Sequence, residues 1–266
     1  MNWIFLRGLT REARHWGGFV GQFEACLSPM RITTQDLPGT GKFHQQTSPL
    51  RVADMVMFAR QQLLAQGIKP PYALLGMSLG AMVCTDWAQR FEKEISCLVL
   101  INTSMRPHCG LLQRLRPGQW LPLLGLAANW DDGQYAERSI HRMTCNQLAR
   151  RDDDLAAWLE IRRSAPVSKA NALRQLLAAA RFACAAQTPR CPALVLSSGA
   201  DQLVNPICST QLAGAWQAAL HTHPWAGHDL PHDDGLWLCE RIREWFLLLT
   251  TQLLTPILCG LMALNT

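Results

Sequence analysis

The feature that most constrains this chain is a serine between two glycines, placed between an apolar run and an amphipathic segment. The run is YALL at residues 72–75, the turn is GMSLG at 76–80, and apolar residues then recur at helical spacing up to Phe91. The pattern predicts a buried strand, a sharp turn and a helix. Glycine is required at 76 and 80 because side chains there would crowd strand and helix. Such a turn exposes a hydroxyl above the sheet end, so Ser78 is a candidate nucleophile.

A serine hydroxyl is a weak nucleophile, so this turn predicts a histidine base and a carboxylate later in the chain. Residues 193–196 (ALVL) indicate a buried strand, and Asp201 lies on the loop that follows it. A shorter strand over 220–225 precedes Gly227 and His228. Because parallel strands end at one edge of a sheet, we expect Asp201 and His228 to lie near Ser78, as a catalytic acid and base.

Competing assignments are weaker. The preceding apolar strand, 97–101, is followed by Asn102, and no carboxylate occurs before Asp131, so Asp201 has no close rival. The other nearby polar residues are interpreted as surface histidines or as turn and helix-start carboxylates before the amphipathic segment 236–246; they are His221, His223, His232, Asp229, Asp233 and Asp234.

Together these motifs resemble the serine-nucleophile branch of the α/β-hydrolase superfamily, over about residues 2 to 248. Residues 35–41 (QDLPGTG) are similar to the D-L-P-G-x-G turn that follows an early strand in that family. The resemblance implies an α/β fold with a mostly parallel, doubly wound sheet and an inserted helical lid. It implies an oxyanion hole formed by the backbone amides of Leu9 and Leu79, and neither a metal nor a cofactor. Serine at 78 disfavours the related epoxide hydrolases and haloalkane dehalogenases, which use aspartate there.

Arg7 is a departure from the family pattern, since many relatives have histidine before the glycine at this point. Arg7, with Arg11 and Arg14 nearby, is a candidate anchor for a substrate carboxylate. The alternative is that these are solvated loop arginines.

The 266 residues, 48% hydrophobic, suit one α/β-hydrolase domain over residues 1–249 with an uncharged apolar tail at 250–266. Between about 104 and 190 the strand pattern gives way to helical patterns, including 152–161 and 170–182, which predicts an inserted lid. Its apolar residues include Trp120, Trp130 and Trp158, candidates for contact with an acyl chain. The alternative is that they pack the lid onto the body.

The predicted lid is also the basic part of the chain. Residues 104–190 carry 13 Lys or Arg and 7 Asp or Glu, a net charge of +6, whereas the whole chain carries +5. This charge would suit an anionic substrate or an acidic acyl-carrier protein, although helix-surface charges are often solvated ion pairs. No nucleic-acid-binding motif accompanies it, so nucleic acid is not an expected partner.

The ten cysteines show no C-x-x-C pair and no zinc-ligand spacing, which favours free thiols in a reducing compartment. The apolar stretch at residues 3–6 is too short for a signal peptide, so a cytoplasmic location is expected. Residues 245–249 are expected to complete the last helix. Polar residues, Pro256 and Gly260 interrupt the tail beyond it, so the tail is expected to pack on the body or be loosely ordered, without membrane contact.

The expected activity is hydrolysis of a small-molecule carboxylic ester through an acyl-enzyme. The compact chain and helical lid resemble small carboxylesterases of the kind that remove the methyl ester from pimeloyl-carrier protein. The same three residues would also serve a thioesterase, a lactonase, a C–C bond hydrolase or an acyltransferase, and these alternatives stay open. A non-catalytic ligand- or partner-binding module on the same fold is a further alternative.

Overall fold

The computed structural model describes residues 1–263, with side chains through residue 249. Its centre is a six-stranded sheet in the order β2-β1-β3-β4-β5-β6, in which every pairing is parallel. The strands are β1 Asn2–Leu6, β2 Arg31–Thr34, β3 Tyr72–Met77, β4 Ile95–Ile101, β5 Ala193–Ser198 and β6 Ala219–His223. The α/β class predicted from the sequence is therefore confirmed.

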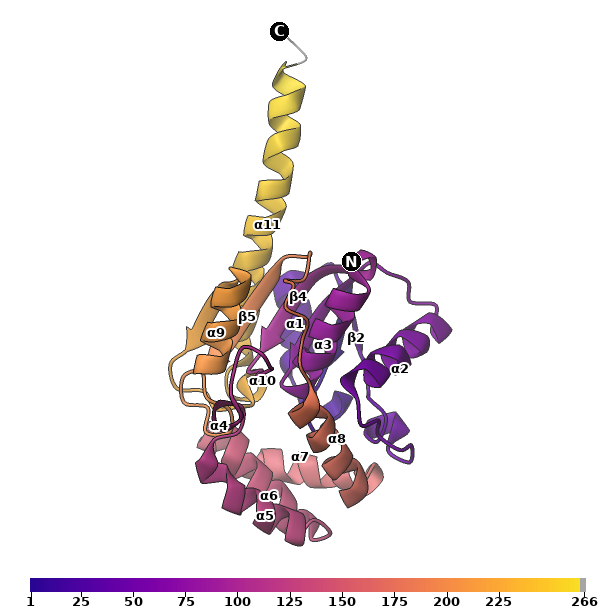
Figure 1. The fold of residues 1–266 in the computed structure, drawn as a ribbon, viewed down its shortest axis with the longest axis vertical. Coiled ribbons are helices and arrows are strands. Elements are labelled where there is room, and N and C mark those ends of the chain that lie inside the picture. Colours follow the sequence, from indigo (N-terminus) through magenta and orange to yellow (C-terminus); the bar gives the residue numbers. More distant parts are fainter. Residues whose placement is uncertain (264–266) are drawn as a thin grey trace.

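Helices connect the strands and cover the sheet (Figure 1). They are α1 Phe19–Leu27, α2 Val52–Ala65, α3 Leu79–Arg90, α4 Leu111–Arg114, α5 Trp120–Ala128, α6 Gly133–Thr144, α7 Arg151–Ser164, α8 Lys169–Arg181, α9 Ile207–Trp216, α10 Leu230–Asp233 and α11 Gly235–Ala263. Short 3₁₀ turns occur at Ala13–Trp16, Gly41–Phe43, Glu92–Glu94, Pro117–Gln119 and Leu148–Arg150.

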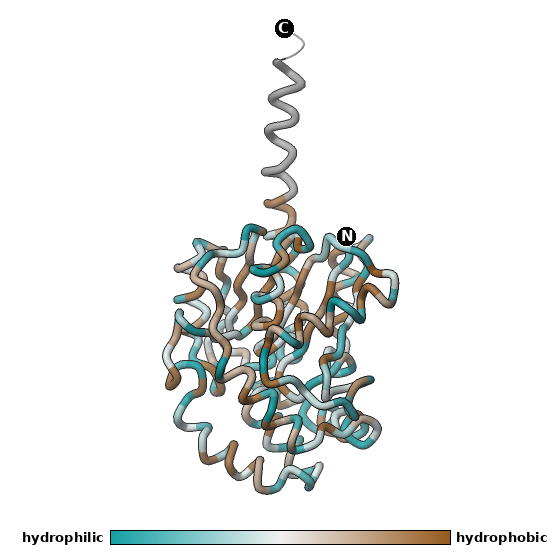
Figure 2. The backbone as a smooth tube through the Cα atoms, turned by 45° about the vertical axis from the view of Figure 1, so that its right-hand side comes forward, coloured by the Kyte–Doolittle hydropathy of each residue, from teal (hydrophilic) through white to brown (hydrophobic). Residues whose placement is uncertain are grey.

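Alternate residues of the central strands bury their side chains in two different cores. On one face, Ile4 of β1 and Leu74 of β3 belong to a cluster with α2, α3 and α9. On the other face, Phe5 and Leu75 belong to a cluster with α1 and α11. Both faces of the sheet are thus covered, as a parallel sheet requires, and Figure 2 shows hydrophobic segments both in the body and in the helices at its lower end.

The five helices between β4 and β5, α4 to α8, form the lid. Helices α5, α6 and α7 gather at one end of the molecule, with α8 between them and the body (Figure 1). The helices predicted at 152–161 and 170–182 are present as α7, which is longer at both ends, and as α8, which is shifted by one residue toward the N-terminus. The lid has its own apolar core, in which Trp130, Ile140, Met143, Trp158 and Ile161 are buried. It is consequently a small packed unit rather than a loop.

The last helix, α11, runs from Gly235 to Ala263 and does not end near residue 249 as the sequence predicted. Asp234 caps its start, because its carboxylate accepts the Trp237 N–H at 3.0 Å. The prediction that the 250–266 tail packs on the body or is loosely ordered depends on side chains beyond residue 249 and on residues 264–266. Both lie outside the described part of the chain. Within the described residues, no helix has the length and apolar content to cross a bilayer.

Candidate active site

Ser78 lies at a sharp turn between β3 and α3. Its φ of 54° and ψ of −115° place a non-glycine residue in a strained backbone region. The glycines on each side permit this turn: a Cβ on Gly76 would lie 2.6 Å from the Gly80 carbonyl oxygen, and one on Gly80 would lie 2.1 Å from that of Leu6. The predicted requirement for glycine at 76 and 80 is therefore confirmed, because a side chain at either position would overlap with backbone atoms. Ser78 itself is partly exposed, while its neighbours are buried.

Asp201 and His228 meet at the same sheet edge, on the loops after β5 and β6. Asp201 Oδ2 lies 2.7 Å from His228 Nδ1, and both side chains are buried. Asp201 Oδ1 accepts the backbone N–H groups of Leu203 and Val204 at 2.8 and 2.9 Å, which fixes the carboxylate. Burial opposes the charged imidazolium, but the charge and hydrogen bond of Asp201 outweigh it and raise the pKa of His228.

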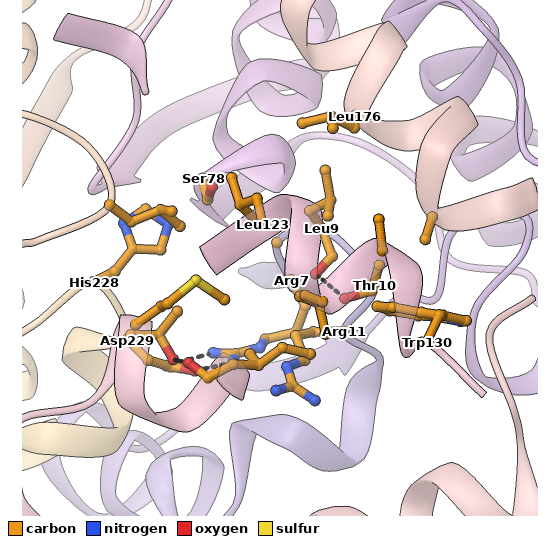
Figure 3. Close-up of a pocket in the computed structure, with 18 of the residues that line it drawn as sticks. Arg7, Leu9, Thr10, Arg11, Ser78, Leu123, Trp130, Leu176, His228 and Asp229 are labelled. Atoms are coloured by element: carbon orange, nitrogen blue, oxygen red, sulfur yellow. Dashed lines mark hydrogen bonds and ion pairs between the residues drawn. The ribbon is translucent and has the colours of Figure 1, made fainter. Parts of the chain in front are cut away.

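Ser78 and His228 line one cavity (Figure 3), although no hydrogen bond joins Ser78 Oγ to the His228 ring. Such bonds are often long in ligand-free enzymes and tighten when substrate binds. The structure therefore brings Asp201 and His228 into direct contact and places Ser78 in the same cavity wall as His228, with no hydrogen bond from its Oγ to another described residue.

Asn102 holds the histidine loop in place. Its amide nitrogen donates to the backbone oxygen of His228 at 2.8 Å and to Ser198 Oγ at 2.9 Å, and its amide oxygen accepts the Ser198 N–H at 2.8 Å. Asn102 adopts a positive φ of 45°, a conformation that asparagine tolerates better than most residues. Sequence reasoning considered Asn102 only as a missing acid; a polar residue at this strand end was the signal of its positioning role.

Gly8 and Leu9 form the loop next to Ser78. A Cβ on Gly8 would lie 3.2 Å from Ser78 Cβ, so this backbone packs directly on the serine. Neither the Leu9 N–H nor the Leu79 N–H donates a hydrogen bond to another described residue, so both predicted oxyanion-hole donors remain available. The neighbouring Thr10 N–H donates to Gln175 Oε1 at 2.8 Å, and thus a buried side chain of α8 holds the loop.

Arg7 is neither a solvated loop arginine nor a free anchor. Its guanidinium makes a two-point ion pair with Asp229, with Nη1–Oδ1 at 3.0 Å and Nη2–Oδ2 at 2.5 Å, and both side chains are at most 4% exposed (Figure 3). Burial opposes the charged carboxylate, but the Arg7 charge and hydrogen bonds outweigh it and hold the pKa of Asp229 below its usual range. Asp229 is the N-cap residue of α10, in line with the helix-start interpretation, but its carboxylate makes no capping hydrogen bond and pairs with Arg7 instead. The pair links the Gly8–Leu9 loop to the His228 loop.

The other two arginines near Arg7 differ from each other. Arg11 is buried, pairs with Glu137 of α6 at 2.6 Å and lies over the Trp158 ring, so the solvated interpretation is wrong for it. Arg14 pairs with Glu12 at 2.6 Å and keeps 47% of its side chain exposed, as expected of a solvated residue.

The lid is tied to the histidine loop through Asp233. This carboxylate accepts backbone N–H groups from Gly227, at 2.6 Å, and from Asn146 and Gln147, at 2.9 Å, just after α6. A Cβ on Gly227 would lie 2.6 Å from the Thr144 carbonyl oxygen, so glycine is needed there for close approach. The surface interpretation of His223 and His232 is also wrong, because both are buried.

The cavity over Ser78 has a volume of about 150 Å³ and a mainly apolar wall. The lid supplies most of this wall, and its basic residue there is Lys169. The apolar residues that the lid contributes are Leu123, Leu126, Ala127, Trp130, Ile140, Met143, Ala172, Leu173 and Leu176. Of the three tryptophans predicted to contact substrate, Trp130 lines the cavity. Trp158 is buried in the lid core and Trp120 is 43% exposed on α5, and neither lines the cavity.

Residues 3–241 match the model of the alpha/beta hydrolase family. Among curated proteins, "Putative carbamate hydrolase RutD" of Escherichia coli O1:K1 is 26% identical over 215 residues, which cover 80% of this chain and 78% of that protein. The protein of the same name from Shigella flexneri is 25% identical over 229 residues, covering 85% and 83%.

Two solved structures share the fold. A thermophilic esterase from Thermogutta terrifontis has a TM-score of 0.73 at 18% identity and covers 92% of this chain and 89% of its own. The enol-lactonase from Burkholderia xenovorans LB400 has a TM-score of 0.76 at 17% identity and covers 92% and 91%.

Proposed function

This chain is a hydrolase that belongs to the α/β-hydrolase family, and from its site we propose that it cleaves carboxylic esters through a Ser78 acyl-enzyme. The observation that carries the proposal is the buried 2.7 Å contact between Asp201 and His228, which opens onto the cavity that contains Ser78. A histidine oriented by a buried carboxylate, next to a serine on a strained turn, is the arrangement that activates a serine hydroxyl.

In the proposed mechanism, His228 removes the Ser78 proton as the hydroxyl oxygen attacks the ester carbonyl carbon. Asp201 keeps Nδ1 of His228 protonated and stabilises the imidazolium, which fits the raised His228 pKa. The Leu9 and Leu79 amides donate to the oxyanion, and the Gly8 contact with Ser78 supports this assignment. His228 then protonates the leaving alcohol, and water repeats the sequence on the acyl-enzyme.

The lining of the cavity supports an apolar acyl group as the substrate moiety. Leucines of α5 and α8 and the Trp130 ring surround the space above Ser78, while Arg7 is already neutralised by Asp229. An acyl chain would bury against this wall at about 25 cal/mol per Å² of apolar surface. A free carboxylate at the reacting end of a substrate would not find an unpaired guanidinium at Arg7, because Asp229 already pairs with it.

A second candidate is a carbamate hydrolase, which the names of the RutD relatives favour. Carbamate cleavage would use the same serine, histidine and oxyanion donors, because it too passes through a tetrahedral intermediate. The apolar wall favours the ester. A matched pair of aryl substrates with one leaving group, an ester and a carbamate, separates the two by their kcat/KM ratio.

The first test is labelling with a fluorophosphonate probe, read by intact mass. We expect one adduct on the wild type and on the control variant Ser164→Ala, an exposed lid serine outside the cavity. Ser78→Ala and His228→Ala should lose the adduct while keeping a wild-type circular dichroism spectrum. A folded wild type that is neither labelled nor active on esters would refute the mechanism and favour a binding module.

The second test is a substrate panel of aryl and methyl esters with acyl chains of increasing length, together with thioesters and lactones. We expect kcat/KM to rise with chain length until the cavity is filled and then to fall. A preference for thioesters, lactones or C–C substrates would reassign the reaction to that class. Transfer of the acyl group to added alcohol in place of water would identify an acyltransferase.

An acidic acyl-carrier protein remains a proposed partner, supported by the lid net charge of +6 and by exposed Arg138, Arg142 and Arg151. Carrier-linked ester should then show a lower KM than free ester at low salt, and the difference should shrink as salt rises. A cytoplasmic location is likewise proposed, supported by the free state of every cysteine within residues 1–249.

A further inference from the structure

A second cluster of reactive side chains lies where the lid meets the body, outside the ester site. His141 and Cys145 lie four residues apart on α6 and its C-cap, and His232 lies on α10. Each residue offers one ligand atom, and these atoms lie within 4.8 Å of one another. Four-residue spacing puts His141 and Cys145 on one helix face, and α10 begins two residues after His228, so the fold brings His232 to that face.

Asp154 of α7 lies against both imidazoles. Its Oδ2 is hydrogen-bonded to Nε2 of His141 at 3.3 Å and lies 2.6 Å from Nε2 of His232. The two rings are nearly perpendicular, with an angle of 86° between their planes. In His141, Asp154 holds Nε2 and leaves Nδ1 for a metal ion, which is the usual support of a histidine ligand.

Two ring nitrogens in this cluster have no hydrogen-bond partner although they are buried. They are Nδ1 of His141, a residue only 1% exposed, and Nε2 of His232, whose contact with Asp154 lacks hydrogen-bond geometry. Buried polar atoms in native proteins are nearly always paired, so unpaired ones call for an explanation. An ion bound between the imidazoles would supply the missing partner to both.

The charge around the cluster favours a cation. Asp154 is 4% exposed, and its ion-pair partners among the described residues are the two histidines, with no Lys or Arg. The Asp233 carboxylate also lies beside the cluster, because it accepts the N–H of Asn146, the residue after Cys145. Its other hydrogen bonds among the described residues also come from backbone N–H groups, and no described arginine or lysine pairs with it.

The cluster is reachable from solvent. His141 and Cys145 line a second cavity on the side of α6 away from Ser78, together with Arg138, Arg142 and Arg151. These arginines are exposed, so water and salt screen their repulsion of a cation more than they screen the buried carboxylate of Asp154. An ion therefore has an entry path, and water from the cavity is available as its fourth ligand.

We propose that His141, Cys145 and His232 bind a divalent transition-metal ion of the zinc type, with Asp154 orienting the imidazole of His141. One thiolate and two imidazoles are ligands that zinc prefers, and a three-residue set with water completes a tetrahedral ion. Zinc bonds of about 2.0 to 2.3 Å need ligand atoms somewhat closer than 4.8 Å, which small side-chain rotations supply. The ion joins α6 of the lid to the helix that follows the His228 loop, and its role is to hold the lid in register with that loop.

Sequence reasoning excluded a metal because the ten cysteines show no zinc spacing. The visible signal was His141 and Cys145 at helical spacing, and the third ligand lies 87 positions further along the chain. The proposal is independent of the ester reaction, because none of the cluster residues lines the cavity that contains Ser78.

The test starts with wild-type protein purified without chelator, followed by metal analysis and thermal unfolding. We expect one zinc ion per chain after equilibration with micromolar zinc, and a fall in Tm of several degrees on chelator treatment that zinc reverses. Cobalt substitution should give a thiolate-to-metal charge-transfer band in the near ultraviolet. A wild type that takes up no stoichiometric metal and has the same Tm with and without chelator would overturn the proposal.

Matched variants assign the ligands. Cys145→Ser should abolish the cobalt–thiolate band, and both it and His232→Gln should weaken zinc binding by about 100-fold or more. The half-buried controls Cys191→Ser and His221→Gln should keep wild-type band and affinity. A band that survives in Cys145→Ser would overturn the assignment. If a ligand variant fails to fold, the wild-type zinc and chelator titrations still decide.

Discussion

Breaking the ion pair between Arg7 and Asp229 tests how far this pair stabilises the site. Both side chains are at most 4% exposed and make two hydrogen bonds to each other, so either partner alone would be a buried, uncompensated charge. Removing one member of such a pair costs about 3–5 kcal/mol. We therefore expect Asp229→Leu and Arg7→Met each to lower the free energy of unfolding by about that amount. At about 2–4 °C per kcal/mol for a chain of this size, Tm should fall by about 10 °C.

The double variant Arg7→Met/Asp229→Leu removes both charges and should recover most of the stability, because buried pairs replaced by apolar residues are often neutral overall. Urea unfolding at pH 7 of the four proteins gives the coupling energy. The Asp229 pKa is lowered on folding, so its contribution is present above the carboxyl pKa of the unfolded chain and is lost only as pH falls through the folded value. At pH 7 this contribution of Asp229 is therefore present.

The activity of the double variant separates packing from positioning. If the pair aligns the Gly8–Leu9 loop with the His228 loop, the stable double variant should still show a reduced kcat on esters. Single variants that each cost less than about 1 kcal/mol, or a double variant whose loss equals the sum of the singles, would refute the reasoning.

Four further predictions follow from the site geometry. Ser78→Gly should remove labelling yet raise stability by about 1 kcal/mol, because glycine relaxes the positive φ; unchanged or lower stability in urea would contradict stored strain. The acid limb of kcat/KM should have an apparent pKa above 6.5 that moves down in Asp201→Asn, since His228 must be neutral to act as base; an unmoved limb would contradict the pair. Asn102→Ala should lower kcat about 100-fold with little change in KM, and an unaltered kcat would remove its positioning role. Gly80→Ala should destabilise the chain by about 3 kcal/mol in thermal unfolding, because its Cβ would meet the Leu6 oxygen, and a stable variant would contradict that contact.

The fold and the sharp turn at Ser78 were predictable from the sequence because their determinants are local. An apolar run, two glycines and a helical pattern lie within 20 residues around Ser78, and each later strand is followed directly by its polar loop residue, as with Asp201. The strand order places Asp201 and His228 on neighbouring loops, because β5 and β6 are parallel neighbours.

The contacts that sequence reasoning missed join distant segments. Arg7 and Asp229 are 222 positions apart, and no local pattern distinguishes a paired loop arginine from a solvated one. The burial of the lid tryptophans was also unpredictable, because Trp120 and Trp158 both lie in helical lid segments. Contacts with distant residues, Arg11 and His232 among them, cover the Trp158 ring, whereas Trp120 stays exposed. The extension of α11 beyond residue 249 runs through Pro256, which a propensity argument treats as a break.

Helix α8 both walls the cavity and fixes the loop beside Ser78. Leu173 and Leu176 face the substrate space, while Gln175 of the same helix accepts the Thr10 N–H. A substrate too bulky for the space would displace α8 and loosen the Thr10 contact, which would shift the Leu9 amide away from the reacting oxygen. Under the proposed ester mechanism, oversized acyl groups would therefore be turned over slowly even where they bind well, so that selectivity is expressed in kcat more than in KM.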